Sequence, residues 1–453
     1  MPLPSSVLAF ALALFSGLAA CSGCAAAAIA SAEYFDANPN AAFAKIPANI
    51  TYDCISSIPV QKDYSEKLPK SMRAWIELDS KLDYLKRPFT GYLWDPIDVL
   101  AEFDRIASSL DNYAGQYDFE MDLQTLGVHC HDGHTGIQGS IATNLATWDR
   151  GFNLISVSKD GLEEPEVYLS SDAVELDAQN NLILKSNTSI SPVRTINELP
   201  VQTFLQTQQL VARSHDPDSM YNQLFLSIPQ SANPDGSRYT TFTSPVFYPG
   251  PETVLRFENG SHYTRTTWTA IKCMPKDITT GQEYWDACVY PEGNVNTTTA
   301  MAMSASSSSP SDIATVTARA APSITQIASH PVPVVIGPGG LLSGYFIDTS
   351  GYDDVAVLVI RSFGDGGLDS YLESFQASLK NFLGQARDGN RTKLIIDLQG
   401  NGGGLTDAGI ELVAQLFPNV PPDQKRNFRA SAGYEIILEK IGSFFGTRKP
   451  RAQ

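Results

Sequence analysis

Two apolar runs, each followed by a helical pattern, constrain the fold of this chain more than any other feature of its sequence. The first run is Asp354-Val-Ala-Val-Leu-Val-Ile360, and a helical stretch follows it to about Arg387. The second is Leu394-Ile-Ile-Asp-Leu398, and a helix is expected from about Thr406 to Leu416. Buried strands that alternate with helices predict a parallel α/β unit. Two strands are too few for a complete parallel sheet, so we expect either that residues 120–290 add strands or that this domain is unfinished.

The loop after the second run is rich in glycine and reads Asp397-Leu-Gln-Gly-Asn-Gly-Gly-Gly404. Consecutive glycines allow backbone N–H groups to converge on one point, and the next helix adds its positive end, which suits a phosphate or an oxyanion. The loop lacks the Lys-Ser/Thr pair of a P-loop and the later acidic residue of a dinucleotide fold. An oxyanion site suits an acidic, exported chain better than a phosphate site, and a plain strand-to-helix turn is the alternative.

Residues 45–150 form an N-terminal region in which residues 64–114 carry helical periodicity. Pro96 suits an early helical position. Two apolar stripes recur at helical spacing, and their members are Leu78, Leu82 and Leu85, then Ile97, Leu100, Phe103, Ile106 and Leu110.

The middle of the chain reads as short strands. From Gly115 to about Val167 the pattern consists of strand-like runs broken by Gly, Asn and Asp, and it continues to residue 290 with one helix near 202–212. Residues 293–330 are rich in Ser, Thr and Ala, which predicts a disordered or O-glycosylated linker.

The N-terminus favours export. No charged side chain occurs from Ser6 to Ala30, an apolar segment begins at Val7, and small-x-small sites end near residue 30, so residues 1–30 are predicted to be a signal peptide. No Lys or Arg precedes Lys45, so the usual positive n-region is missing. An uncleaved signal anchor and a bacterial lipoprotein box ending at Cys21 are the alternatives.

The composition agrees with export and excludes several partners. Only 18% of residues are charged and the formal net charge is −17. This balance argues against a nucleic-acid partner and against docking on an anionic membrane, leaving no membrane contact beyond the signal segment. We expect the protein in the secretory pathway, either outside the cell or in a vacuolar or endomembrane lumen. Glycosylation sequons occur at Asn49, Asn187, Asn259, Asn296 and Asn390.

Four cysteines lie outside the predicted signal peptide, which suggests two disulfides in an exported chain. Cys273 and Cys288 flank a short segment and are the preferred pair, which leaves Cys54 with Cys130. Buried free thiols are the alternative.

Three of the six histidines lie in Val128-His-Cys-His-Asp-Gly-His134. On a strand His129 and His131 would share one face, as metal ligands can. However, the segment differs from the HxHxDH pattern of metallo-β-lactamases, and no other His has ligand-like spacing. The second interpretation is a general base: a His in a Gly-containing turn can activate a Ser or Cys if a carboxylate orients it. A solvated polar turn is the third.

The motifs together resemble a known family. LIIDLQGNGGG is similar to the strand and NxGG loop of tail-specific, or C-terminal-processing, serine peptidases of the S41 family. It is closest to a fungal secreted branch related to the chlamydial protease-like factor. Further stretches that look like this branch run in the same order, and they are CISSIPV at 54–60, LKRPFTGYLWDPIDVLAEFDRI at 85–106, YDFEMDLQTLGVHCHDGHTG at 117–136, DPDSMYNQLF at 216–225, GYFIDTSGYDDVAVLVIRSF at 344–363 and QLFP at 415–418.

The resemblance implies a fold, a reaction and site residues. The fold would be a multidomain α+β fold with an N-terminal helical region, a PDZ-like module over 151–292 and a partial S41-type α/β domain over 340–453. Asp-Gly-His would place the general base at His134, and the NxGG loop would place an oxyanion donor at the backbone N–H of Gly403 or Gly404. The substrate would be a peptide or protein, no cofactor would be needed, and maturation of fungal ribosomally made peptides would be one role.

The chain departs from the family pattern at the nucleophile, for which no matching Ser is found. In these peptidases the Ser lies on a later strand-to-helix turn, which here would fall beyond Gln453. Ser431 and Ser443 lie too close to the glycine loop, and Thr406 is expected to cap the next helix. We therefore expect a truncated gene model or a spliced-out C-terminus. The alternative function is a catalytically inactive pseudo-peptidase that binds peptides.

Overall fold

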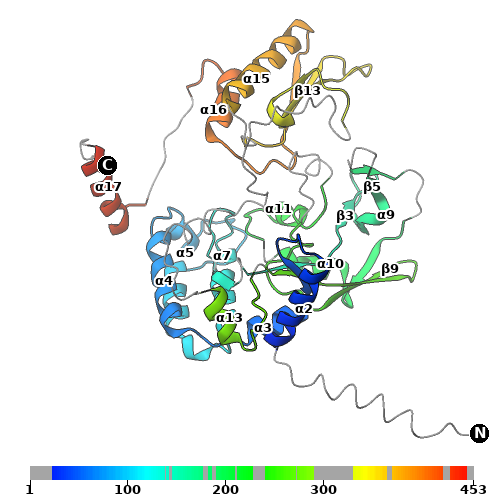
Figure 1. Cartoon of the computed structure of the whole chain (residues 1–453). Coiled ribbons are helices and arrows are strands. Elements are labelled where there is room, and N and C mark those ends of the chain that lie inside the picture. The colour runs from blue at the N-terminus through cyan, green and yellow to red at the C-terminus, as the bar shows by residue number, and fades with distance from the viewer. Residues whose placement is uncertain are drawn as a thin grey trace, which may run out of the picture.

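The structure, a computed structural model, describes residues 23–137, 139–141, 145–176, 182–185, 190–209, 212–227, 240–271, 273–289, 330–364, 370–421 and 429–445. Helices dominate the N-terminal region, small antiparallel sheets the middle, and a mixed α/β unit the C-terminal region (Figure 1). The predicted α+β class is confirmed. The predicted linker, most of the predicted signal peptide, Asn187 and Asn296 lie outside the described residues.

The N-terminal region is helical, and its helices from α4 to α7 pack around an apolar cluster that includes Leu82, Phe103, Phe119 and Leu123. Their bounds are α2 (Gly23–Ala37), α3 (Ala48–Ser56), α4 (Lys62–Ile76), α5 (Leu82–Lys86), α6 (Val99–Ser108), a 3-10 turn (Leu110–Asn112) and α7 (Gln116–His129).

Helix α6 begins later than the position of Pro96 suggested. Asp98 is its N-cap, and the Asp98 carboxylate accepts a hydrogen bond from the Ala101 N–H at 3.2 Å. Pro96 thus precedes the helix, because the side-chain cap sets its first turn.

Helix α7 corrects a second prediction, since short strands were expected from Gly115 onward. Its buried side carries the polar residues Gln116, Glu120 and Gln124 beside apolar ones, while Asp118 and His129 are exposed. Because polar residues lie on both sides of this helix, its amphipathic period is weak and its pattern resembles broken strands. His129 and His131 therefore share no strand face.

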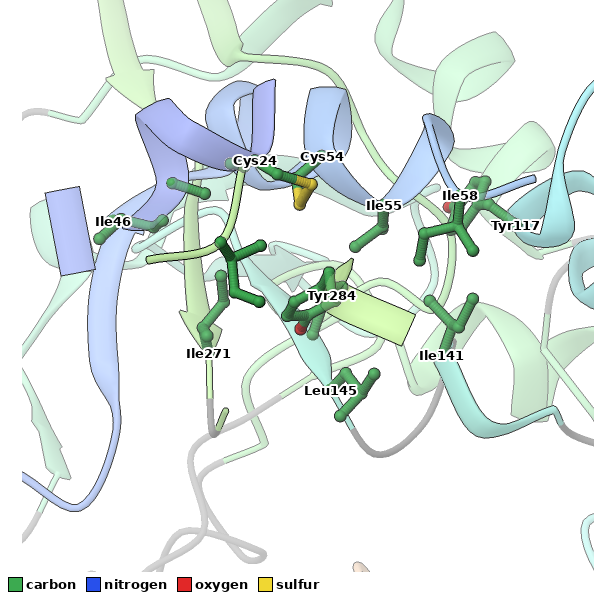
Figure 2. Packing of buried hydrophobic residues seen from close by; sticks show 14 of the residues in the cluster. Cys24, Ile46, Cys54, Ile55, Ile58, Tyr117, Ile141, Leu145, Ile271 and Tyr284 are labelled. Carbon is green, nitrogen blue, oxygen red and sulfur yellow. A yellow bond between two sulfur atoms is a disulfide. The ribbon is translucent and has the colours of Figure 1, made fainter. Parts of the chain in front are cut away.

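A disulfide joins the first two helices above a second core. Cys24 of α2 is bonded to Cys54 of α3, and Figure 2 shows this bond beside apolar side chains that come from several elements. The sheet under it has the order β1-β11-β2, with β1 (Ala44–Pro47), β2 (Ala146–Asp149) and β11 (Trp268–Ile271), and α13 (Gly281–Cys288) packs nearby.

The cysteine predictions are half right. Cys273 and Cys288 form a disulfide as expected. The expected bond between Cys54 and Cys130 is wrong, because Cys54 pairs with Cys24 and Cys130 is a buried free thiol. The error came from setting Cys24 aside with the predicted signal peptide.

The middle of the chain contains a four-stranded sheet of order β10-β9-β7-β8 and two hairpins. The helix expected near 202–212 is confirmed as α10. The bounds are β3 (Leu154–Val157), β4 (Glu166–Leu169), α9 (Ser170–Ala173), β5 (Val174–Leu176), β6 (Leu182–Leu184), β7 (Val193–Ile196), β8 (Leu199–Pro200), α10 (Val201–Gln209), α11 (Pro217–Asn222), β9 (Glu252–Phe257) and β10 (His262–Thr266).

The C-terminal unit has a four-stranded sheet of order β12-β13-β14-β15. Strands β14 and β15 pair in parallel as predicted, whereas β12 and β13 are antiparallel to their neighbours. The bounds are β12 (Val335–Ile336), a 3-10 turn (Pro338–Gly340), β13 (Leu342–Phe346), β14 (Val355–Ile360), α15 (Tyr371–Asp388), β15 (Lys393–Asp397), α16 (Thr406–Leu416) and α17 (Ala432–Phe445). Among the described residues, the strands of 120–290 belong to other sheets, so the expectation that they extend this one is wrong.

Strand β15 is exposed, although its apolar run predicted a buried strand. Leu394, Ile395 and Ile396 are 37%, 49% and 39% exposed. Strand β15 is the edge of the described sheet and has β14 on one side only, while Phe375, Leu379 and Phe382 of α15 pack into the core with β13 and β14.

No described helix combines the length and the apolar character that a membrane span requires.

Candidate functional site

The glycine loop, residues 398–405, connects β15 to α16 and is held by one side chain. Asn401 Nδ2 donates to the Ile360 carbonyl at 2.9 Å, and Asn401 Oδ1 accepts from the Gly403 N–H at 2.7 Å. The Asn401 amide therefore fastens the loop to the end of β14 and sets the course of its own backbone.

Gly404 lies against the backbone that follows β14. The Phe363 N–H donates to the Gly403 carbonyl and the Leu405 N–H donates to the Phe363 carbonyl, each at 2.7 Å. Gly404 has φ 138°, and a Cβ added there would lie 2.1 Å from the carbonyl carbon of Phe363. Only glycine fits this approach.

The two candidate oxyanion donors differ. The Gly403 N–H is already engaged by Asn401, whereas the Gly404 N–H makes no hydrogen bond to any residue in the described part of the chain. A pocket of about 420 Å³ opens here, lined by Phe363, Gly403, Gly404, Leu405, Thr406, Gly409, Ile410 and Val413. A free N–H in such a pocket can bind an oxyanion.

Helix α16 begins directly after this loop. Its positive end adds to the field at the pocket. Thr406 is its first residue rather than its cap, because Leu405 is the N-cap and no side chain accepts a hydrogen bond there. The expectation that Thr406 caps the helix is thus wrong, and Thr406 lines the pocket instead.

The histidine segment lies at the C-terminal end of α7. His131 follows the helix with a left-handed φ of 47°, and its N–H donates to the Val128 carbonyl at 2.9 Å. The His131 ring is buried and stacks on Trp94, with ring centroids 4.2 Å apart. Burial lowers the pKa of His131 to about 4, so the imidazole is neutral at pH 7.

His134, the predicted general base, is exposed in the turn that follows. Its backbone N–H donates to Asp132 Oδ1 at 2.8 Å, and Asp132 Oδ2 lies 2.8 Å from Lys81 Nζ. Partial burial alone would raise the pKa of Asp132, but the bond from Lys81 and the His134 N–H outweigh it and hold that pKa below its ordinary value. The loop thus carries an ionised carboxylate next to His134. Within the described ranges, no carboxylate is paired with the His134 ring itself.

Among the described residues, the glycine loop and the histidine segment are not in direct contact. The pocket at Gly404 includes no residue of the histidine segment, and no hydrogen bond connects the two loops across the described residues. Figure 1 shows α16 and α7 in different groups of elements. The general-base and oxyanion roles therefore stay predictions.

The remaining candidates are the two serines considered as nucleophiles and a metal site. Ser431 Oγ accepts from the Tyr434 N–H at 3.2 Å, at the start of α17. The side chain of Ser443 lies outside the described residues. For metal binding, the described part of the chain contains no group of three His, Cys, Asp or Glu side chains that could hold an ion.

Sequence reasoning missed three residues that shape these loops. Asn401 was seen only as part of a motif, although an Asn between glycines is a usual source of turn-fixing hydrogen bonds. Lys81 and Trp94 lie far from the histidines in sequence, and no local signal connects them to that segment.

Comparison with known proteins gives two family matches. Residues 147–274 match the CPAF-like PDZ domain, and residues 354–435 match peptidase family S41.

Fungal relatives match a longer stretch. The chain is 32% identical over 364 residues to the peptidase S41 family protein phomP1' of Diaporthe leptostromiformis, covering 78% of this chain and 51% of that protein. It is 34% identical over 92 residues to the peptidase S41 family protein ustP of Aspergillus flavus, which is 20% of this chain and 19% of the relative.

A solved structure of mature CPAF complexed with lactacystin aligns with a TM-score of 0.41 and 15% identity, over 78% of this chain and 59% of the other. The chain spans about half the length of the curated phomP1' relative. The S41 and PDZ matches and the fungal relatives together show that the chain belongs to peptidase family S41.

Proposed function

We propose that this chain is a serine-type endopeptidase of the S41 type that cleaves peptide or protein substrates. His134 would accept the proton of the attacking Ser hydroxyl, and the tetrahedral oxyanion would be stabilised by the N–H of Gly404, with Gly403 as the second candidate. No cofactor enters this reaction. The nucleophile stays unassigned, because no Ser among the described residues lines the pocket at Gly404.

One observation carries this proposal. Gly404 has a free N–H in a pocket at the start of a helix, and its backbone position excludes every side chain except hydrogen. The close approach to Phe363 holds the Gly404 backbone in place, and a donor that is fixed before charge develops is the kind that stabilises an oxyanion.

We propose a secreted or ribosomally made peptide precursor of a fungal secondary-metabolite pathway as the substrate, acted on in the secretory pathway. The similarity to fungal relatives supports the first part of this proposal. Two disulfides, which persist in oxidising compartments, support the second.

A second candidate is a pseudo-peptidase that binds peptides without cleaving them. Strand β10 is an edge of the four-stranded sheet within the PDZ-like match, and most of its residues are exposed. An extended peptide can add to such an edge as a further strand.

The test compares two single variants in the histidine segment. Purified full chain, His134→Ala and His129→Ala are assayed with a mixture of internally quenched peptides, and peptide binding is followed by fluorescence anisotropy. His129 is exposed like His134 and lies in the same segment, so it is the matched control.

If His134 is the base, His134→Ala lowers turnover by about 100-fold or more while His129→Ala does not. Equal loss in both variants would remove His134 from its assigned role. Binding without turnover in all three proteins would instead support the peptide-binding candidate.

A further inference from the structure

A pocket of about 490 Å³ lies between α5, residues 88–94 and the start of α11. Its walls are mainly apolar or aromatic, and we call it the aromatic pocket; the lining residues used below are Tyr84, Leu85, Phe89, Tyr92, Leu93 and Trp94. This volume is typical of small-ligand and side-chain sites.

Three of these side chains are unusually open. Tyr84, Phe89 and Leu93 are 69%, 68% and 67% exposed. Single exposed apolar residues are ordinary, but several around one hollow mark an interaction site. The hollow is therefore a candidate for binding rather than a packing defect.

The aromatic pocket is built onto the histidine segment. The Trp94 ring stacks on His131, and Lys81 at the pocket wall binds Asp132 at 2.8 Å and the hydroxyl of Thr135. These contacts lie on both sides of His134 in the sequence, so the pocket and the proposed base belong to one packed unit.

Most polar groups at the pocket margin are already engaged, and the exception is the buried Tyr92 hydroxyl, which has no hydrogen-bond partner among the described residues. Lys81 is paired with Asp79 and Asp132, and Trp94 Nε1 donates to the His215 carbonyl at 2.8 Å. The Asp216 carboxylate accepts from the Ser219 N–H at 2.9 Å. Because the Lys81 ammonium is already paired with two carboxylates, the pocket offers its occupant mainly apolar surface, with the Tyr92 hydroxyl as a polar group.

The ring geometry favours an aromatic occupant. Phe89 and Tyr92 are arranged edge to face at 5.9 Å, and Tyr92 and His215 at 6.5 Å. A further ring entering between such rings gains edge-to-face contacts in addition to the area that it buries.

We propose that the aromatic pocket is a specificity site that accepts an aromatic side chain of the peptide substrate close to the bond cleaved at His134. This proposal rests on the proposed peptidase function, because it places the scissile bond next to the histidine segment. The pocket would select the substrate, and His134 would act on the held chain.

The test measures binding separately from cleavage. The probes are two fluorescein-labelled decapeptides of Gly, Ser and Ala that differ only in a central Phe or Ala. They are titrated into the full chain and into His134→Ala, and each is also offered as an internally quenched substrate. The pocket variant is Tyr84→Ala with Phe89→Ala, and Tyr352→Ala, an exposed aromatic elsewhere (61%), is the control.

We expect the Phe peptide to bind at least tenfold more tightly than the Ala peptide, to both the full chain and His134→Ala. The double variant should lose this preference while keeping its circular dichroism and melting temperature, because both side chains are exposed. Tyr352→Ala should keep the preference.

Equal affinity for the two peptides, no binding of either, or a preference that survives in the double variant would overturn the proposal. If the double variant instead abolishes self-association in sedimentation and the peptides bind equally, the pocket contacts a second copy and the proposal fails. Phe-selective binding without any turnover would leave the pocket standing and refute the peptidase function. Turnover without Phe selectivity would support the peptidase function and refute the role of the pocket.

Discussion

The glycine loop and the histidine segment are assigned complementary chemical roles but are built in opposite ways. In the glycine loop the proposed functional group is a backbone N–H, and its position depends on Asn401 and on the absence of a side chain at Gly404. In the histidine segment the proposed functional group is a side chain, and its surroundings come from Lys81 and Trp94, which are distant in sequence.

This difference has a general consequence. A backbone site requires a particular local conformation, so glycines reveal it in the sequence. A side-chain site requires a particular neighbourhood, which only the tertiary fold creates. The loops should therefore respond differently to substitution: the glycine loop sharply and locally, and the histidine segment through its distant partners.

The largest effect is expected at Gly404. Gly404→Ala would push a methyl group into the Phe363 backbone, so we expect a lower melting temperature and a loss of peptidase turnover of about 100-fold or more. Gly402→Ala is the matched control, since nothing lies within 4 Å of an added Cβ there. Similar behaviour of the two variants in thermal melts and turnover assays would show that the approach to Phe363 is not needed.

The second effect tests the distant support of the histidine segment. Lys81→Met removes the ammonium group that holds Asp79 and Asp132, and we expect the free energy of unfolding to fall by about 2 kcal/mol in urea titrations. Lys62→Met removes a pair with Asp111 that is exposed to solvent, and it should change stability much less. If both variants are equally stable, Lys81 is not a support of this segment.

A smaller and more local effect is expected at Asn401. Asn401→Ala removes both side-chain hydrogen bonds of the glycine loop, which should cost about 1 kcal/mol and speed amide exchange at Gly403. Asn381→Ala, on the exposed face of α15, serves as the comparison. Unchanged exchange at Gly403 would mean that the backbone holds its course without the Asn401 amide.

The smallest effect is a pH dependence of the histidine segment. The pKa of His131 is about 4 in the folded chain and about 6.5 when unfolded, so the unfolded state binds the proton more readily. Stability from this group is complete above pH 6.5 and is lost progressively as the pH falls toward 4. Melting temperatures of the full chain and of His131→Asn, a residue that tolerates the left-handed conformation, should converge over this window. Parallel curves would contradict the assignment.

The same contrast explains what could be read from the sequence. The parallel β14–β15 pair, α16 and the Cys273–Cys288 bond each follow from local patterns and are confirmed. Helix α7 was missed because polar residues such as Gln116, Glu120 and Gln124 lie on its buried side and weaken its periodicity.

Strand β15 was placed correctly but its burial was not. Its apolar run resembles that of β14, and only the sheet order distinguishes the covered strand from the exposed one. For the candidate site, the glycine motif indicated a loop whose role stays a prediction, and it did not show that Asn401 occupies the Gly403 N–H while that of Gly404 has no partner among the described residues.

The bond between Cys24 and Cys54 allows an experiment to determine whether cleavage near residue 30 comes before or after disulfide formation. A cut near residue 30 after oxidation would leave a short peptide attached through sulfur, which reducing agent would release. The same cut before oxidation would leave Cys54 as a titratable thiol, and a cut ahead of Gly23 would leave one continuous chain. Intact mass with and without reduction would thus report whether processing precedes or follows disulfide formation.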